Sequence, residues 1–258
     1  MKYITSLLAA SAMMVAAPAI AQDTYVSLSG GIKTQSDSDN NGAFSSDFTT
    51  GQGSDAIPLG TPLPAGTDVG WTTDFKSGYH LNAAIGKDMG ALRFEGELSL
   101  EKAKVDTHTG VSAAGLDLTS QDAAVLITGQ ATGLGVTVGN LVADGQGDIK
   151  STSVFANVFY DIETDSAITP YVGGGIGYGW NKVDYSPSAT PIIDDKDNGF
   201  VWQAMAGAAF AVSDRSAITA GVRYRDSSDL EVDASLFPAT FEVENTRTLF
   251  EVGYRLGF

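Results

Sequence analysis

Apolar and polar residues alternate along much of this chain, most clearly near its C-terminal end. From Thr246 to Phe258, apolar or aromatic side chains at every second position are separated by mostly charged or small ones. The same alternation runs through 92–101 and 218–225. A period of two residues is typical of β-strands whose two faces meet different surroundings. Each segment is about as long as the ~9–11 residues that a tilted membrane-spanning strand needs.

Weaker alternation marks further strands, and the connections between all of them differ in length. The weaker segments are 24–33, 77–87, 151–162, 168–180 and 200–212. Short turns at 87–90, 163–166 and 213–215 alternate with long polar loops at 34–75, 103–150, 181–199 and 226–245. Short turns at one end and long loops at the other predict an all-β fold, an eight-stranded antiparallel up-and-down transmembrane β-barrel with both termini on the periplasmic side. The apolar stretch 123–142 leaves an additional hairpin, and therefore a ten-stranded barrel, as the alternative.

Charged residues fall on one face of the predicted strands. The faces that we expect to point into the lumen carry Arg93, Glu95, Glu97, Glu101, Asp161, Arg223, Arg225, Arg247, Glu251 and Arg255. Acidic and basic side chains balance in this set, which predicts a lumen charge network of ion pairs. The opposite faces are uncharged, and their aromatic residues gather toward both strand ends, as expected at the two membrane interfaces. A soluble barrel of the lipocalin kind is the alternative, but it would have to bury the charged face or expose it unusually.

The composition excludes several kinds of site. The 258 residues include no Cys and two His, with 31 acidic against 15 basic residues for a formal net charge of −16. Disulfides and Cys-ligated metals are therefore excluded, and clustered cations for nucleic-acid binding are lacking. We predict no cofactor and no nucleic-acid partner.

The N-terminal residues have the pattern of a secretory signal peptide. A basic start at Lys2 precedes an apolar run over 7–17, and Ala19-Ile20-Ala21 has the form of a cleavage site. We expect 1–21 to be removed, which leaves 22–258 as an outer-membrane barrel domain. The net negative charge of the four long loops then equals that of the whole mature chain.

Candidate chemistry is sparse, and each case has a structural explanation. Glu95 and Glu97 lie two positions apart on one strand face, as paired catalytic carboxylates can, but the nearby arginines favour ion pairs. The runs 37–42 and 194–199 begin like calcium loops yet lack the Glu that completes such a loop. His80 is expected to be a hydrogen-bonded lumen residue. We predict no catalytic residue and no metal site.

Two segments resemble known outer-membrane proteins. The segment 248–258, with Phe250, Val252, Tyr254, Leu256 and Phe258 on one face, resembles the C-terminal assembly signal of bacterial outer-membrane proteins. The runs 157–161 and 169–178 resemble the fourth and fifth strands of small OmpA-like and opacity-type porin-family barrels. The resemblance implies insertion by the outer-membrane assembly machinery and contact with outer-membrane lipid and lipopolysaccharide. It implies no shared activity.

Three functions remain open at this stage. The leading hypothesis is a noncatalytic barrel whose acidic extracellular loops supply surface interactions or envelope integrity, with an extracellular partner that the sequence does not identify. The second is a narrow channel for ions or small solutes, because Gly173, Gly175, Gly177 and Gly179, with Gly207, Ala209 and Ala211, give one sector of the lumen little side-chain volume. A lipid-processing enzyme that uses His80 is third.

Overall fold

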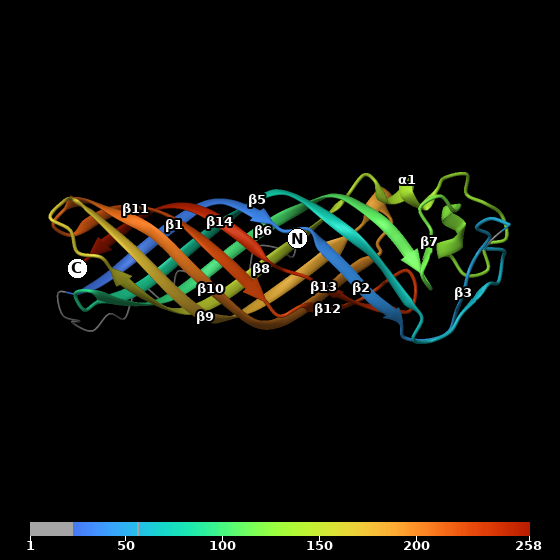
Figure 1. Ribbon diagram of the computed structural model, residues 1–258, viewed down its shortest axis with the longest axis horizontal. Coiled ribbons are helices and arrows are strands. Elements are labelled where there is room, and N and C mark those ends of the chain that lie inside the picture. The colour runs from blue at the N-terminus through green and yellow to red at the C-terminus, as the bar shows by residue number, and fades with distance from the viewer. Residues whose placement is uncertain (1–22, 56) are drawn as a thin grey trace, which may run out of the picture.

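The computed structural model describes residues 23–55 and 57–258, and its wall is a closed ring of antiparallel strands (Figure 1). The predicted signal peptide, 1–21, lies outside the described residues. The ring runs through β1 (Thr24–Gln35), β5 (Asp68–Asp88), β6 (Leu92–Ala113), β8 (Gly147–Asp161), β9 (Ile168–Tyr185), β10 (Ile193–Ser213), β11 (Ser216–Ser227) and β14 (Arg247–Gly257). Each strand pairs with its neighbours in this order, and β1 pairs with β14 from Tyr25↔Gly257 to Gln35↔Arg247. The predicted all-β antiparallel fold is confirmed.

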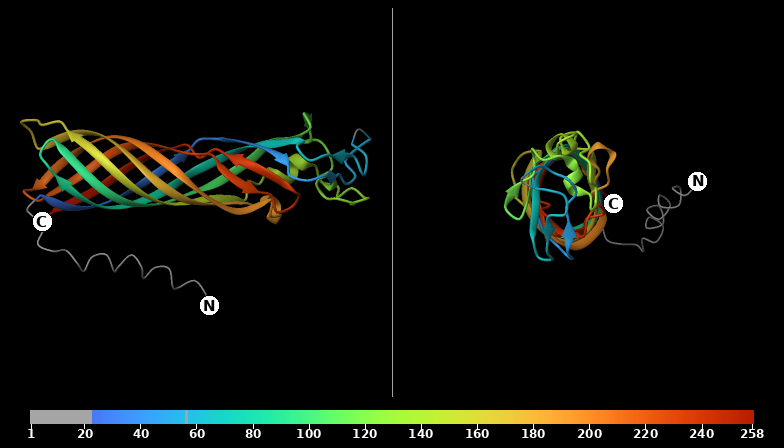
Figure 2. Two further views of the ribbon diagram at one scale, coloured as in Figure 1. Left: turned by 90° about the horizontal axis from the view of Figure 1, so that it is seen from below. Right: turned by 90° about the vertical axis from the view of Figure 1, so that its right-hand side faces the viewer.

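The two ends of the ring differ (Figure 2). At one end lie the short turns between β5 and β6, β8 and β9, and β10 and β11, together with the start of β1 and the end of β14. The backbone N–H of Phe258 donates to Thr24 O there at 2.9 Å. The remaining, shorter elements lie toward the other end.

Beyond the end of β1 at Gln35 and the start of β14 at Arg247, three short strands continue the wall. These are β2 (Ser38–Phe44), β12 (Leu230–Asp233) and β13 (Ala239–Val243), and the sheet order is β12-β13-β2-β5. An isolated bridge between Ile193 and Ala234 joins this hairpin to β10. We call this part the distal tier: β2, β12 and β13 with residues 68–76, 103–113, 147–150, 181–185 and 193–199. The rest of the ring is the proximal tier.

Small elements cover the far end of the distal tier. They are β3 (Phe48–Thr49), β4 (Pro62–Leu63), β7 (Leu116–Asp117), the 3₁₀ helices η2 (Ala123–Leu126) and η3 (Pro187–Ala189), and α1 (Val138–Val142). None of the helices in the described part of the chain is long and apolar enough to cross a membrane.

The stretch 123–142 does not form the hairpin that the ten-stranded alternative needed. The Asp122 carboxylate accepts hydrogen bonds from the backbone N–H groups of Ala124, Leu134 and Gly135, at 2.8–2.9 Å. These bonds cap η2 and fold the chain back onto it, and Gly135 has a positive φ of 74°. Because the local amides bind this carboxylate, they are not available to a strand ladder.

The inner and outer faces of the wall exchange polarity between the two tiers. In the proximal part of β6, Leu98 and Leu100 are exposed while Glu97 and Glu101 are buried; in its distal part Lys104 and Asp106 are exposed while Val105 is buried. The proximal tier is therefore apolar outside and polar inside, and the distal tier is the reverse. Most buried apolar side chains of the protein form one cluster inside the distal tier and its covering segments. Strand residues occupy parts of all four ranges that were expected to be loops.

Candidate functional site

The end of the proximal lumen next to the distal tier holds Glu101, a carboxylate surrounded by three cations. Its oxygens lie 2.7 Å from Arg225 Nη1, 2.7 Å from Arg247 Nε and 3.3 Å from Lys33 Nζ. These groups come from β6, β11, β14 and β1, so the cluster ties together strands from different parts of the ring. All four side chains are almost wholly buried.

A second carboxylate, Glu97, lies one step closer to the turns. It accepts from Arg223 Nη1 and from Arg225 Nη2, each at 2.6 Å. Arg223 also reaches Glu251, with 2.8 Å between Nε and Oε1. Gln203 and the amide of Asn157 complete the hydrogen bonding around these groups. The carboxylate and the guanidinium groups at this level are therefore multiply bonded.

The third group fills the end of the lumen near the turns. Arg93 makes a two-pronged contact with Asp161, at 2.6 and 2.9 Å, and lies 3.3 Å from Glu95. The hydroxyl of Tyr25 donates to Glu95 at 2.6 Å. The guanidinium carbon of Arg255 lies 5.4 Å from the centre of the Tyr25 ring, which is a cation–π contact.

The structure thus brings nine of the ten residues of the expected network into ion pairs, and Arg255 joins them through Tyr25. Sequence reasoning missed Lys33, which gives the lumen one cation more than the balanced set. The signal was present: Lys33 follows the outward positions Leu28, Gly30 and Ile32 in the inward phase. Lys33 is the last residue of the predicted segment 24–33 and borders the polar range 34–75, so the alternation alone does not distinguish it from a loop residue.

The glycine-rich sector of β9 does not leave open space. A Cβ at Gly173 would meet the Phe159 ring at 2.5 Å, and one at Gly177 would meet the Phe155 ring at 2.7 Å. The Tyr171 hydroxyl occupies the space beside Gly207 in the same way. Aromatic side chains therefore occupy the space beside Gly173, Gly177 and Gly207, which corrects the expectation that this sector holds little side-chain volume.

A layer of amides and hydroxyls separates the charged lumen from the apolar distal core. Gln35 Nε2 donates to Asn245 Oδ1 at 3.2 Å, and Asn245 Nδ2 donates to Asn181 Oδ1 at 3.3 Å. The hydroxyl of Ser151 donates to the same Asn181 oxygen at 2.6 Å. Polarity inside the barrel therefore falls in steps from charged to neutral polar to apolar.

The other candidate residues occupy structural positions. His80 Nε2 lies 3.3 Å from the Phe250 carbonyl oxygen, and its Nδ1 lies 3.2 Å from the Asn82 amide. The run 37–42 enters strand β2. In the run 194–199, the Asp195 and Asp197 carboxylates each accept a backbone N–H from β12, at 3.0 Å. Both calcium-like runs are therefore parts of the distal wall.

The residues of the expected assembly signal lie on the outward face at the C-terminal end. Their exposed fractions range from 43% to 63%, for Leu256, Phe258, Tyr254, Phe250 and Val252. Exposed apolar side chains of this kind surround the whole proximal tier. Such a continuous apolar belt is unusual on a protein that faces only water.

The sequence matches a family of known proteins over most of its length. The sequence model of the family described as outer membrane protein beta-barrel domain matches residues 5–255. Outer membrane protein PagN of Salmonella typhimurium is 28% identical over 91 residues, which are 33% of this chain and 37% of PagN, so the match spans about a third of that relative.

Two solved structures are similar to this chain at low sequence identity. Neisserial surface protein A has a TM-score of 0.46 and 16% identity, with 91% of this chain and 97% of that chain covered. The outer membrane protein OprG from Pseudomonas aeruginosa has a TM-score of 0.49 and 12% identity, with 91% and 96% covered.

Proposed function

The chain belongs to the outer membrane protein beta-barrel domain family, and from that premise we propose that it is a noncatalytic barrel with a filled lumen whose acidic distal tier makes interactions at the cell surface. The predicted outer-membrane location is confirmed by the family match. In the proposal, the ring of eight strands spans the membrane through its proximal tier, and the distal tier projects outside the cell. The narrower resemblance to OmpA-like and opacity-type barrels stays a prediction.

The packing of the proximal lumen is the observation that carries the proposal. Ion pairs cross the lumen at three levels, centred on Glu101, Glu97 and Arg93. Aromatic side chains cover the glycine-rich wall between them. An interior of about eight strands is just wide enough for side chains to fill. The filled lumen supports a structural or surface role over the narrow channel that was the second hypothesis.

The same ion pairs argue against catalysis in the lumen. Glu95 and Glu97 are the pair of carboxylates with a spacing suited to acid–base chemistry, yet both are bound by buried arginines. His80 is held by a backbone carbonyl and a side-chain amide. Groups held in this way lack the open coordination that a substrate needs.

The distal tier offers a concentrated negative charge. Its β12–β13 hairpin and the residues that flank it carry several exposed carboxylates that make no ion pair among the described residues, and Asp229, Glu231, Glu242 and Glu244 are four of them. A surface of one sign attracts ions and partners of the opposite sign. We propose that basic partners, and divalent cations shared with lipopolysaccharide, bind here.

The channel alternative is tested by recording single-channel conductance of the mature protein in planar bilayers. The proposal expects no steps from inserted, heat-modifiable protein. Stable steps that change when Arg223 or Glu95 is substituted would replace it with the channel hypothesis.

The surface role is tested with two variants that lose equal charge. The distal variant carries Asp229→Asn, Glu231→Gln, Glu242→Gln and Glu244→Gln; the control carries Asp23→Asn, Glu163→Gln, Asp165→Asn and Asp214→Asn at the turn end. In nanodiscs, binding of polylysine and the calcium dependence of binding to lipopolysaccharide should weaken in the distal variant only. Equal weakening in both variants, or none, would contradict the distal site.

For the C-terminal residues, we propose the assembly role that their resemblance implies. Phe258→Ala removes the terminal aromatic side chain. The hydrogen bond from the backbone N–H of residue 258 to Thr24 O remains possible. We expect slower insertion by the purified assembly machinery and unchanged heat stability once the barrel is folded.

A further inference from the structure

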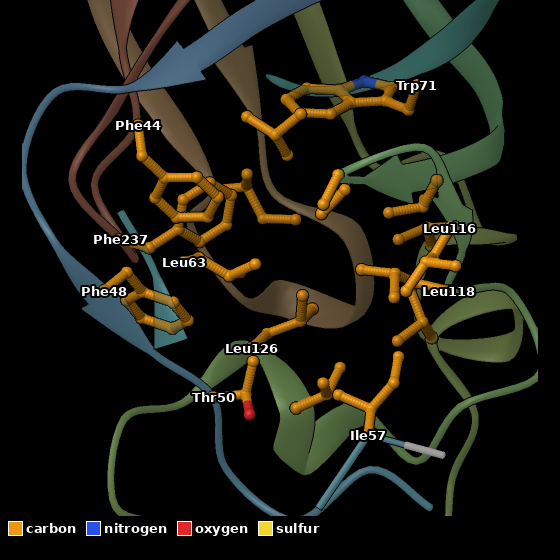
Figure 3. A pocket seen from close by; sticks show the side chains of 18 of the residues that line it. Phe44, Phe48, Thr50, Ile57, Leu63, Trp71, Leu116, Leu118, Leu126 and Phe237 are labelled. Carbon is orange, nitrogen blue, oxygen red and sulfur yellow. The ribbon is translucent and has the colours of Figure 1, made fainter. Parts of the chain in front are cut away.

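An apolar cavity of about 100 Å³ lies between the mouth of the barrel and the segments that cover the distal tier (Figure 3). Phe44, Phe48 and Phe237 form one side, and Leu116 and Leu118 lie opposite them. Trp71 lies toward the barrel. No residue that lines the cavity carries a formal charge when its histidine is neutral.

Two side chains of this lining, His108 and Tyr185, each have a buried polar atom without a partner. The side chains are 4% and 1% exposed, and their rings meet at 4.9 Å between centroids. Among the described residues, neither His108 Nε2 nor the Tyr185 hydroxyl has a hydrogen bond. Leaving such an atom unsatisfied inside a protein costs about 1–3 kcal/mol, so it calls for an explanation.

The hydrogen bonds of Thr73 determine which ring nitrogen of His108 carries the proton. The Thr73 hydroxyl oxygen accepts from Asn40 Nδ2 at 2.7 Å and from Trp71 Nε1 at 3.1 Å, which uses both of its lone pairs. Its own proton therefore goes to His108 Nδ1, 2.8 Å away. In the neutral ring the remaining proton is on Nε2, which makes that atom a free donor.

The Tyr185 hydroxyl also lacks a hydrogen-bond partner among the described residues. This hydroxyl lies near Thr73, but the Thr73 hydroxyl has neither a lone pair nor a proton left for it. The proton of the Tyr185 hydroxyl consequently has no acceptor among the described residues. Burial lowers the pKa of His108 to about 4, so its ring is neutral at physiological pH and suits an uncharged ligand.

We propose that this cavity binds a small neutral molecule with an apolar body and one hydroxyl or carbonyl oxygen, which pairs with His108 Nε2 and the Tyr185 hydroxyl. The volume is comparable to that of the roughly 150 Å³ engineered cavity that binds benzene, so the body has about the size of a single ring. The apolar lining excludes ions, because an ion here would lose its hydration without a compensating charge. The inference goes beyond the proposed surface role and does not depend on it.

Phenol and toluene are matched probes, since they share a shape and differ in the hydroxyl. The mature protein, ¹⁵N-labelled and folded in nanodiscs, is titrated with each probe while the indole N–H signals of its tryptophans are followed. We expect a saturable shift of the Trp71 signal, with no saturable shift of Trp180 or Trp202 on the outer surface. Phenol should bind about fivefold more tightly than toluene, as one net hydrogen bond implies.

Three variants distinguish the effect of the two polar atoms from the effect of the cavity volume, and both from binding of the probes to lipid. His108→Leu with Tyr185→Phe should equalise the two affinities, and Tyr185→Phe alone, which removes only an oxygen, should reduce the preference if the double variant does not fold. Val125→Phe, which fills the cavity, should abolish the saturable shift for both probes. Unresponsive Trp71, equal affinities in the wild type (as expected if the two atoms hold only water), or unchanged binding in Val125→Phe would overturn the proposal.

Discussion

Glu101 shows how much of the lumen depends on single residues. Three cations converge on it, and all are buried. A buried ion pair adds little stability by itself, because the charges lose their hydration, but removing one partner leaves the others uncompensated. The stability of the proximal tier is therefore sensitive to the loss of this carboxylate.

Glu101→Gln should lower the free energy of unfolding by about 3–5 kcal/mol, measured by urea unfolding in micelles. The control is Asp106→Asn, which breaks the exposed pair with Lys76 at 3.1 Å and should cost no more than about 1 kcal/mol. Equal effects of the two substitutions would show that the lumen is hydrated rather than packed.

His108 predicts a pH dependence confined to the distal tier. Burial lowers the pKa of its ring from 6.5 to about 4 in the folded protein. The unfolded state binds its proton first, so the stabilisation is complete above pH 6.5 and is lost as the pH falls toward 4. Between pH 7 and 5 the loss amounts to roughly 2 kcal/mol.

Hydrogen exchange of the β2 and β13 amides measures this loss. Exchange corrected for its intrinsic pH dependence should accelerate between pH 7 and 5 in the wild type. In His108→Asn the extra acceleration should disappear. A persistent acceleration would assign it to other groups, among which Asp144 acts on His108 through its charge.

At the scale of elements, the sequence predicts the proximal strands well and the distal ones poorly. Lipid outside and charge inside produce the clear alternation of β6, β11 and β14. In β5 the register shifts between Gly70 and Thr72, between Asp74 and Phe75, and between Lys76 and Tyr79. Each bulge interrupts the period of two, so the distal part of β5 reads as a polar loop.

The network residues were predictable for the same reason that the proximal strands were, whereas the cavity depends on contacts between segments far apart in the chain.

The seam between β10 and β12 is held by side chains in place of a full strand ladder. Asp197 accepts the backbone N–H of Glu231, and Asp195 accepts that of Asp233. Asp195→Ala with Asp197→Ala should lower the local opening free energy at these two amides by about 1 kcal/mol each, read as faster amide exchange. Asp194→Ala, which breaks only the ion pair with Lys182, should leave them protected. Faster exchange in both variants would point to a general effect of charge.

At the scale of the whole molecule, the outer face changes from apolar to polar between the two tiers. This change marks where the proposed membrane ends. Leu98 and Asp106 both point outward from β6, one in each tier. Leu98→Arg should destabilise the inserted barrel by roughly 2–4 kcal/mol, the cost of such a charge near the bilayer midplane. Asp106→Arg should have little effect. Refolding equilibria in lipid vesicles distinguish the two, and a small effect of Leu98→Arg would displace the proximal tier from the bilayer.

The separate closure of the two tiers also bears on how the protein can evolve. β1 and β14 close the proximal ring, whereas β2, β12 and β13 close the distal wall with different stretches of chain. A substitution, insertion or recombination in the hairpins around 36–67 and 228–246 leaves the β1–β14 register unchanged. In the proposed orientation, the surface outside the cell can therefore diversify while the wall that faces the lipid stays constant.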